Sequence, residues 1–388
     1  MTNLIRRTFA ELLTFSRAST GTHFDLNGKL ITAAVDQPRF DFDSLTKAPR
    51  GLLIEPARTN LLLRSNEFGT APWTFPNATP VANSINGPDG TLSATRLVET
   101  TANSTHQLAQ VVTLAAATEH VLSVFAKAGE RNTIDLTATS PGMTATTTRF
   151  DLSAGTIITG STGWIEPLKS GWFRISSLIP TVTGGSSTMV LRLYNGAGTY
   201  VGNTASGAYF YGAQLEEGGF PSSYIPTLGA TANRAIDSAT MALSDFWNAS
   251  EGAIFVSADY IASSAQESAT RYAFQIDDGT QDNRISVFNR NGTRNGVTII
   301  ADTDTQCAFD GGVAGPARCK IALSWKENAF AFCVDGGPVQ TDVLGILPLL
   351  TTLRMGHRSV SSGRLGGHVS ATYFPTAQTN AELIAYTS

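Results

Sequence analysis

The sequence is poor in charged residues and has no long apolar run, and each shortage excludes a class of protein. Asp, Glu, Lys and Arg make up 15% of its 388 residues, whereas roughly 25% is usual for soluble domains. The net charge of −4 gives no basic footprint for nucleic acid, which requires several phosphate contacts. No apolar run approaches the roughly 20 residues that a membrane-spanning helix needs. We therefore expect neither nucleic-acid binding nor membrane insertion.

Cysteine and histidine are also scarce. Cysteine occurs only at Cys307, Cys319 and Cys333, without the Cys-x-x-Cys spacing of metal or redox sites. We predict that these cysteines are reduced and act as small, mostly buried apolar residues. The five histidines are dispersed, with no His-x-His or His-Glu-x-x-His grouping, so a catalytic zinc site is not expected.

The N-terminal residues do not resemble a secretion signal. Such a signal needs an uninterrupted apolar stretch, and Arg6, Arg7 and Glu11 interrupt the apolar positions here. We expect synthesis in the cytoplasm, without export by a signal peptide.

Short alternating runs separated by turns dominate the chain after residue 64. In one of them, Met189, Leu191 and Leu193 face one way, while Arg192 and Tyr194 face the other. Turns rich in Gly, Asn and Pro separate the runs. This pattern predicts an all-β fold with two antiparallel β-sandwich, or jelly-roll, domains.

A second β pattern begins beyond residue 230, where Ile254, Val256 and Ala258 alternate with Phe255, Ser257 and Asp259. We divide the chain into an N-terminal arm (1–64), a first sandwich (65–229) and a second sandwich (230–388). Near the end of the chain, Thr379 and Glu382 have the spacing of a capping box, which predicts a short closing helix.

The arm is predicted to be ordered. Leu4, Leu12 and their neighbours recur at helical spacing, so residues Asn3–Thr14 are expected to form a short amphipathic helix. Its apolar stripe either docks on the arm or first domain, or contributes to a contact with another chain. Asn27-Gly28 lies between short alternating runs and predicts a tight hairpin, because both residues tolerate positive φ.

Four stretches together resemble segments of bacteriophage tail-fibre, spike and related virion proteins. The longest reads Ala-Pro-Arg-Gly-Leu-Leu-Ile-Glu-Pro-Ala-Arg-Thr-Asn-Leu-Leu-Leu-Arg-Ser-Asn-Glu-Phe, residues 48–68. Phe-Ser-Arg-Ala-Ser-Thr-Gly-Thr (15–22) and Pro-Arg-Phe-Asp-Phe-Asp (38–43) precede it, and Tyr-Gly-Ala-Gln-Leu-Glu-Glu-Gly-Gly-Phe-Pro-Ser-Ser-Tyr-Ile-Pro-Thr (211–227) follows. The resemblance implies a first sandwich like a carbohydrate-binding module. The second half resembles concanavalin A-like, laminin-G-like sandwiches, in which a strand pair precedes an Asp-Gly-Gly turn, here residues 335–337.

The resemblance implies a virion fibre or spike that attaches to the host surface by binding polysaccharide. It also implies contacts with other virion proteins, a homotrimer and a place in the tail or head appendage. Two alternatives stay open: a purely structural virion component, and a polysaccharide depolymerase. The acidic pairs 216–217, 277–278 and 302/304 are the candidates for the last, but the Glu-x-Asp-x-x-Glu strand of concanavalin-like glycosidases is absent. We therefore predict that the protein is not an enzyme.

Sugar rings stack on aromatic faces beside polar side chains that bind their hydroxyls. Trp73 follows Pro72 in a loop-like stretch and is the first candidate, although it also suits edge packing of the sandwich. The other candidates for glycan binding are His106, Gln107, Tyr194 and Tyr200.

Modules of the resembled kind often hold a structural calcium ion through oxygen ligands. By position, Glu67 and Asp237 are the candidates for such a site. No other cofactor is expected.

Overall fold

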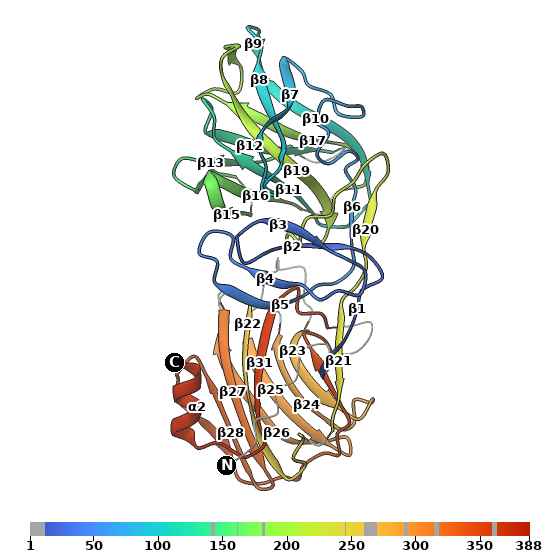
Figure 1. Ribbon diagram of the computed structural model, residues 1–388, viewed down its shortest axis with the longest axis vertical. Helices are drawn as coiled ribbons and strands as arrows, with labels where there is room; N and C mark the ends of the chain where they lie inside the picture. The colour runs from blue at the N-terminus through green and yellow to red at the C-terminus, as the bar shows by residue number, and fades with distance from the viewer. Residues whose placement is uncertain are drawn as a thin grey trace.

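The chain forms two β-sandwiches stacked along its long axis, with strands of the N-terminal arm between them (Figure 1). The computed structural model describes residues 12–140, 144–160, 162–180, 183–244, 246–259, 270–290, 294–313, 318–358 and 363–388. The predicted all-β class is confirmed, because antiparallel sheets account for nearly all regular structure in these residues.

The first sandwich consists of a five-stranded and a six-stranded antiparallel sheet. The five-stranded sheet has the order β10 (His106–Leu114), β17 (Gly185–Tyr194), β12 (Thr133–Thr139), β13 (Thr146–Asp151) and β14 (Thr156–Thr159). The six-stranded sheet has the order β15 (Gly163–Pro167), β16 (Trp172–Ile179), β11 (His120–Lys127), β19 (Gly207–Glu217), β8 (Leu92–Glu99) and β7 (Ala78–Asn86). A small ribbon joins β9 (Asn103–Ser104) to β18 (Tyr200–Val201).

The alternation predicted for residues 189–194 is confirmed in β17. Met189, Leu191 and Leu193 are buried in the core that the two sheets share. Arg192 points to the opposite face of its sheet, where it pairs with Asp135 of β12 at 2.5 Å. Period-two patterning therefore separates the packed face of this sheet from its polar face.

The second sandwich consists of two seven-stranded sheets. One has the order β29 (Gln340–Asp342), β28 (Ala329–Val334), β27 (Arg318–Lys326), β22 (Glu251–Asp259), β31 (Gly367–Phe374), β5 (Pro49–Ile54) and β4 (Phe40–Phe42). The other has the order β1 (Thr14–Ser16), β21 (Ser238–Ala242), β30 (Thr352–Met355), β23 (Thr270–Asp277), β24 (Arg284–Arg290), β25 (Arg294–Ala301) and β26 (Asp304–Val313). Residues of both sheets, among them Ile254, Trp325 and Ile299, form one buried core.

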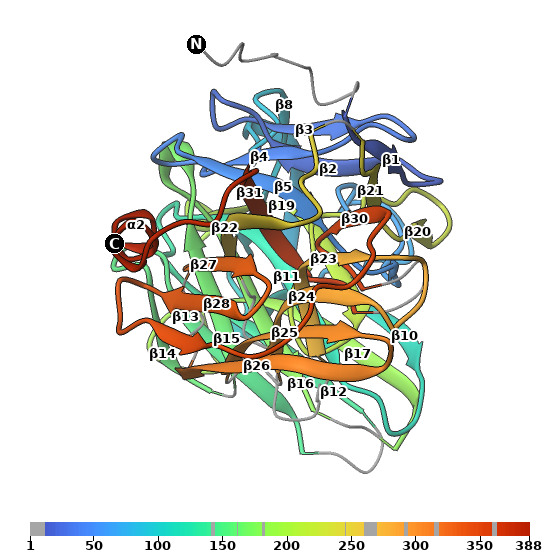
Figure 2. The same cartoon turned by 90° about the horizontal axis from the view of Figure 1, so that it is seen from below.

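The arm completes the second sandwich instead of preceding both domains as a separate unit. β4 and β5 extend one sheet beside β31, and β1 adds to β21 in the other (Figure 2). A further pair, β6 (Arg58–Asn60) with β20 (Ala232–Arg234), lies where the chain enters and leaves the first sandwich. Strand pairing therefore joins two segments that the predicted boundaries at 64/65 and 229/230 assign to different units, the arm and the second sandwich.

The predicted hairpin of the arm is present as β2 (Gly21–Phe24) and β3 (Leu30–Ala33). Its Phe24 and Leu30 pack against Phe125 and Trp172 of the first sandwich, so the hairpin attaches the arm to that sandwich through apolar contacts. Of the predicted N-terminal helix, residues 3–11 lie outside the described residues, and Thr14 is the first residue of β1.

The closing helix α2 (Asn380–Thr387) begins with the predicted capping box. The Thr379 backbone amide donates to a Glu382 carboxylate oxygen at 2.7 Å, and the Glu382 amide donates to the Thr379 hydroxyl at 3.3 Å. Cys307, Cys319 and Cys333 are buried and are not joined by disulfides within the described part of the chain, as predicted. Among the described residues, no helix has the length and apolar character to cross a membrane.

Replacing Gly28 by Ala is expected to destabilise the chain more than a matched glycine replacement. Gly28 has φ +72°, and an added Cβ would lie 2.2 Å from the backbone oxygen of Ser44. Gly196 has a similar φ of +78° but nothing within 4 Å of its Cβ position. Gly196→Ala is expected to cost about 1–2 kcal/mol for the left-handed backbone. Gly28→Ala adds a steric cost of about 1–3 kcal/mol. Urea unfolding of both variants measures the difference, and equal losses would contradict it.

Candidate functional site

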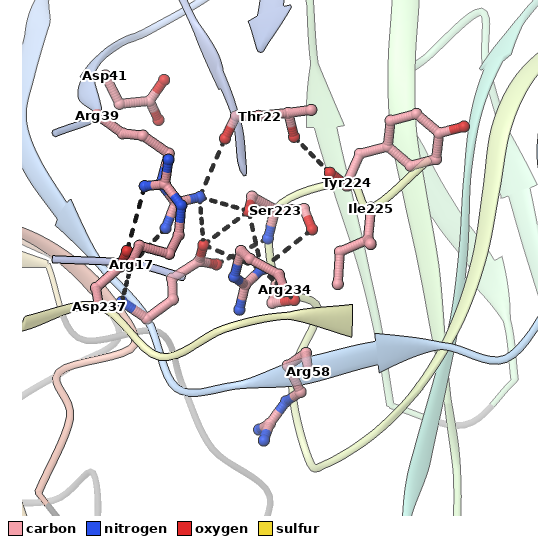
Figure 3. Close-up of polar contacts among 12 residues, drawn as sticks. Arg17, Thr22, Arg39, Asp41, Arg58, Ser223, Tyr224, Ile225, Arg234 and Asp237 are labelled. Atoms are coloured by element: carbon pink, nitrogen blue, oxygen red, sulfur yellow. Dashed lines mark hydrogen bonds and ion pairs between the residues drawn. The ribbon is translucent and has the colours of Figure 1, made fainter. Parts of the chain in front are cut away.

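A buried network of arginines and carboxylates joins the arm to both sandwiches. We call it the junction network, and it consists of Arg17, Arg39, Glu55, Arg234 and Asp237. Each of these side chains is at most 1% exposed. Arg39 pairs with both carboxylates of the network. Its Nη1 lies 2.7 Å from Glu55 Oε2, and its Nη2 lies 2.5 Å from Asp237 Oδ2 (Figure 3).

The outer members of the network close it on both sides. Arg234 Nη1 lies 3.1 Å from Glu55 Oε2, and Arg17 Nη1 lies 3.4 Å from Asp237 Oδ1. The backbone amide of Glu55 also donates to Asp237 Oδ2 at 2.8 Å. Because both carboxylates meet two guanidinium groups, no negative charge is buried without a partner.

Ser223 brings the first sandwich into the network. Its amide donates to Glu55 Oε1 at 2.8 Å, and its hydroxyl donates to Glu55 Oε2 at 2.7 Å. Burial alone would raise the pKa of Glu55, but the charges of Arg234 and Arg39 and the Ser223 hydrogen bonds hold that pKa well below its ordinary value. Glu55 is therefore a fixed anion.

The four stretches that carry the family resemblance meet in this network. Arg17, Arg39, Glu55 and Ser223 come from the first, second, third and fourth stretch, respectively. Their contacts hold the arm and the two sandwiches together. Arg234 and Asp237 complete the network from outside these stretches.

A cavity of about 450 Å³ lies beside the network, and we call it the junction cavity. It is enclosed by the β2–β3 hairpin, strands β15 and β16 of the first sandwich, and strands β22 and β31 of the second. Glu55, a member of the network, lines the cavity, and so does Ser223, which donates a hydrogen bond to Glu55. Its other lining residues include Thr22, His23, Phe24, Asp41, Arg50, Phe125, Trp164, Glu166, Arg174, Ser176, Asp259 and His368.

One wall of the cavity is aromatic and its rim is charged. Trp164, on the sheet-edge strand β15, is partly exposed. At the rim, Arg50 Nη2 lies 2.7 Å from both Glu166 Oε1 and Asp43 Oδ2. Burial works against ionisation of Asp43, but hydrogen bonds from Thr46 and Arg50 lower its pKa to about 2. The rim therefore holds fixed charges beside an apolar surface.

His368 bridges two carboxylates at the cavity wall. Its Nε2 lies 2.7 Å from Asp41 Oδ2, and its Nδ1 lies 3.2 Å from Asp259 Oδ2. Burial would lower the pKa of His368, but hydrogen bonds to both carboxylates raise it above its ordinary value. Because both ring nitrogens are engaged, His368 has no free lone pair with which to act as a base.

His23 presents the opposite situation. Within the described part of the chain, its buried Nδ1 has no hydrogen-bond partner. Burial lowers the pKa of His23, which favours the neutral ring. A buried polar atom without a partner is uncommon in folded proteins; the His23 ring lines the cavity, but this nitrogen is not exposed to it.

The five predicted glycan-binding residues do not form one exposed surface. Trp73 is only 3% exposed; its indole N–H donates to the Arg64 carbonyl at 3.0 Å, so the predicted stacking role does not fit its position. His106 and Tyr200 are buried and their rings are in contact. One face of the Tyr194 ring is covered by the Arg149 guanidinium group, 3.2 Å from the ring centroid. Gln107 lies cross-strand from Arg192.

The two predicted calcium ligands are engaged elsewhere. Glu67 pairs with Arg64 at 2.6 Å on the surface, and Asp237 belongs to the junction network. Among the described residues, no three His, Cys, Asp or Glu side chains are grouped to hold a metal ion. A calcium site that uses these residues therefore stays a prediction.

Sequence reasoning missed the junction cavity because its lining residues come from distant segments. Trp164 lies in a short strand, and its position in the sequence carries no sign of a cavity. His23 and His368 are isolated in the sequence. The one available signal was that the resembling stretches contain several charged residues within apolar blocks.

No protein-family model and no curated protein matches the chain. Among solved structures, the carbohydrate-binding module CBM40 of Ruminococcus gnavus IT-sialidase, bound to α2,3-sialyllactose, is 15% identical with a TM-score of 0.31, covering 36% of this chain and 84% of that one. Domains LG4–5 of the mouse laminin α1 chain are 11% identical with a TM-score of 0.26, covering 72% and 90%. A pentraxin from Limulus polyphemus is 13% identical with a TM-score of 0.28, covering 36% and 70%. Similarities this low carry no argument about what the chain binds.

Replacing Glu55 by Gln is expected to destabilise the protein strongly. The change leaves Arg39 and Arg234 buried with one carboxylate fewer, and breaking a buried ion pair typically costs about 3–5 kcal/mol. Glu67→Gln is the matched control, because its pair with Arg64 is exposed and such pairs contribute about 0–1 kcal/mol. Denaturant unfolding of both variants measures the contrast; a similar small loss in each would show that the network is not a stabilising joint.

Replacing His368 by Gln is expected to change how stability depends on pH. Folding raises the pKa of His368, so its ion pairs stabilise the fold fully below the unfolded-state pKa of ~6.5 and are lost as pH rises through the raised value. The wild-type protein should therefore exceed His368→Gln in melting temperature most at about pH 5.5, with the excess shrinking toward about pH 9. Thermal unfolding across this range tests the prediction.

His120→Gln is the control with the opposite sign. Burial lowers the pKa of His120, so the stability linked to its neutral form is lost as pH falls below ~6.5. An equal pH trend in both variants would contradict the assignment of His368 as a charged bridge.

Proposed function

We propose that the protein binds glycan in the junction cavity and does not hydrolyse it. The observation that carries this proposal is a partly exposed Trp164 on the wall of a cavity that also holds fixed polar groups. Sugar rings present apolar C–H faces to aromatic side chains and hydroxyls to polar ones. A volume of about 450 Å³ falls within the range of roughly 300–1,000 Å³ typical of small-ligand sites.

The polar groups of the cavity suit hydroxyl recognition. His23 and Ser176 line the cavity with polar side chains. Arg50 and Glu166 hold each other in place at the rim, so their remaining donor and acceptor positions are oriented before a ligand arrives. Preorganised groups reduce the entropy lost on binding.

The carboxylates of the cavity favour binding over hydrolysis. A glycosidase needs one carboxylic acid that keeps its proton, through a raised pKa, opposite a second carboxylate. Each carboxylate that lines this cavity has a cationic partner: Asp41 and Asp259 with His368, Glu55 with Arg39 and Arg234, and Glu166 with Arg50.

One member of each of two acidic pairs noted in the sequence is also engaged. Asp277 pairs with Arg354 at 2.7 Å, and buried Glu216 accepts hydrogen bonds from Ser222 and Gln214. These contacts favour a structural role for both residues over a part in a depolymerase.

In this proposal the protein is a virion fibre or spike, made in a bacterial cytoplasm and displayed as a homotrimer that attaches to host-surface polysaccharide. The four resembling stretches support it, and three linked copies would gain avidity over weak single sites. A purely structural virion component is the second candidate. Val343, Leu344 and Leu349 favour it, because their exposures of 69%, 73% and 81% provide an apolar surface for other virion proteins.

Replacing Trp164 by Ala is expected to weaken polysaccharide binding about tenfold or more, because truncating a central aromatic contact typically costs about 2 kcal/mol. Binding to capsular and lipopolysaccharide preparations from candidate hosts is measured together with release of reducing ends. Phe75→Ala is the matched control, since Phe75 is 41% exposed and lies outside the cavity lining.

Saturable binding without released sugar, lost in Trp164→Ala and retained in Phe75→Ala, is the expected outcome. Equal binding by both variants would remove the junction cavity as the site. Absence of binding to every preparation would leave the structural candidate.

A further inference from the structure

Lysine is rare in this chain, yet half of its lysines line one cleft. The six lysines are Lys29, Lys47, Lys127, Lys169, Lys320 and Lys326. A cleft of about 570 Å³ is lined by Lys29, Lys127 and Lys169. It lies between the β2–β3 turn, the β7–β8 turn and the 3₁₀ turn η1 (Lys169–Gly171), and we call it the lysine cleft.

Three separate elements deliver these side chains. Lys29 follows the Asn27-Gly28 turn, and its Cε lies 3.0 Å from the Cβ position of Gly90 in the opposite turn. Lys169 Nζ donates to the Asn27 carbonyl at 3.1 Å, across the cleft from its own element. Lys127 ends β11. The arrangement is therefore a product of the contact between the arm and the first sandwich.

Within the described part of the chain, no carboxylate lines the cleft or forms an ion pair with its lysines, Lys29, Lys127 and Lys169. The charge of Lys29 acts on Asp25 without forming an ion pair with it. Most arginines of the chain, in contrast, are paired with carboxylates, as in the junction network.

Hydrogen bonds tie the elements around the cleft together. Trp172 is buried at the base of the cleft, and its indole N–H donates to the Asn86 carbonyl at 3.2 Å. The amide of Leu30 donates to the Pro88 carbonyl at 3.0 Å and ties the two turns together. Like charges held in a fixed concave site attract a counter-ion from solution.

We infer that the lysine cleft binds the anionic groups, carboxylate or sulfate, of an acidic polysaccharide. The inference rests on the proposed glycan-binding function and adds the charge of the ligand to it. Lysine ammonium groups act as point charges without a fixed fork geometry, so they accept anions in varied orientations along a polymer. The β2–β3 hairpin borders both sites, with Leu30 lining the junction cavity and Lys29 lining the cleft.

The test uses one polymer backbone with and without charge: dextran, carboxymethyl-dextran and dextran sulfate. The cleft variant is Lys29→Gln, Lys127→Gln and Lys169→Gln combined. The control variant combines Lys47→Gln, Lys320→Gln and Lys326→Gln, which removes the same charge from the other three lysines. Affinities are measured on the full chain at about 50 and 200 mM NaCl, and melting temperatures confirm that both variants fold.

We expect the wild-type protein to bind a charged dextran more tightly than dextran. The cleft variant should lose about tenfold in that affinity, corresponding to three modest charge contacts, and most of the salt dependence. The control variant should change less than about twofold. Preference for carboxymethyl-dextran or for dextran sulfate identifies the anion.

Equal losses in the two triple variants would overturn the inference in favour of general charge attraction, and no loss in either would overturn it outright. Trp164→Ala is measured with the same polymers to separate the two sites. Cleft-dependent binding that survives Trp164→Ala would support the lysine cleft, while the host-polysaccharide assay independently decides the junction cavity.

Discussion

The ion pairs that Arg39 makes with Glu55 and Asp237 are the contact on which the arrangement of the whole chain depends. They connect three segments: the one just before β4, which contains Arg39, the end of β5, which Glu55 follows, and the segment from the first sandwich to β21, which contains Asp237. Buried charges are tolerated only when their partners are all present, so the network forms only when these three segments are assembled together. This requirement gives the two sandwiches one defined relative position.

The junction cavity and the lysine cleft are both consequences of that assembly. Each is formed where the β2–β3 hairpin meets the first sandwich, and neither lies wholly within one sheet. Trp164 and His23 face one cavity although about 140 residues separate them in the chain. Binding capacity in this protein is therefore located at contacts between units, where the relative position of the units sets the shape of the site.

Arginine and lysine have different roles here. Arginines with planar, multidentate groups satisfy buried carboxylates at the junction, as Arg39 does, and on sheet faces, as Arg149 and Arg192 do with Asp135. Lysines are few, and those in the cleft form no ion pair with a carboxylate in the described residues. Because most arginines pair with carboxylates of the same chain, a protein with few charged residues can still present one concentrated positive site, the lysine cleft.

The sequence by itself determined the local features, because these depend on neighbouring residues. Alternation in β17, the Asn27-Gly28 hairpin and the Thr379 capping box follow from side-chain periodicity and backbone preference. The four resembling stretches also contain the residues of the arm that form the junction network, but the sequence did not indicate what those residues do. Only the tertiary structure decided that the arm completes the second sandwich, that Trp73 is buried and that Trp164 lines a cavity. Those outcomes depend on hydrogen bonds and packing between segments far apart in the chain, and a local pattern does not specify which distant partner a strand or an aromatic ring will meet.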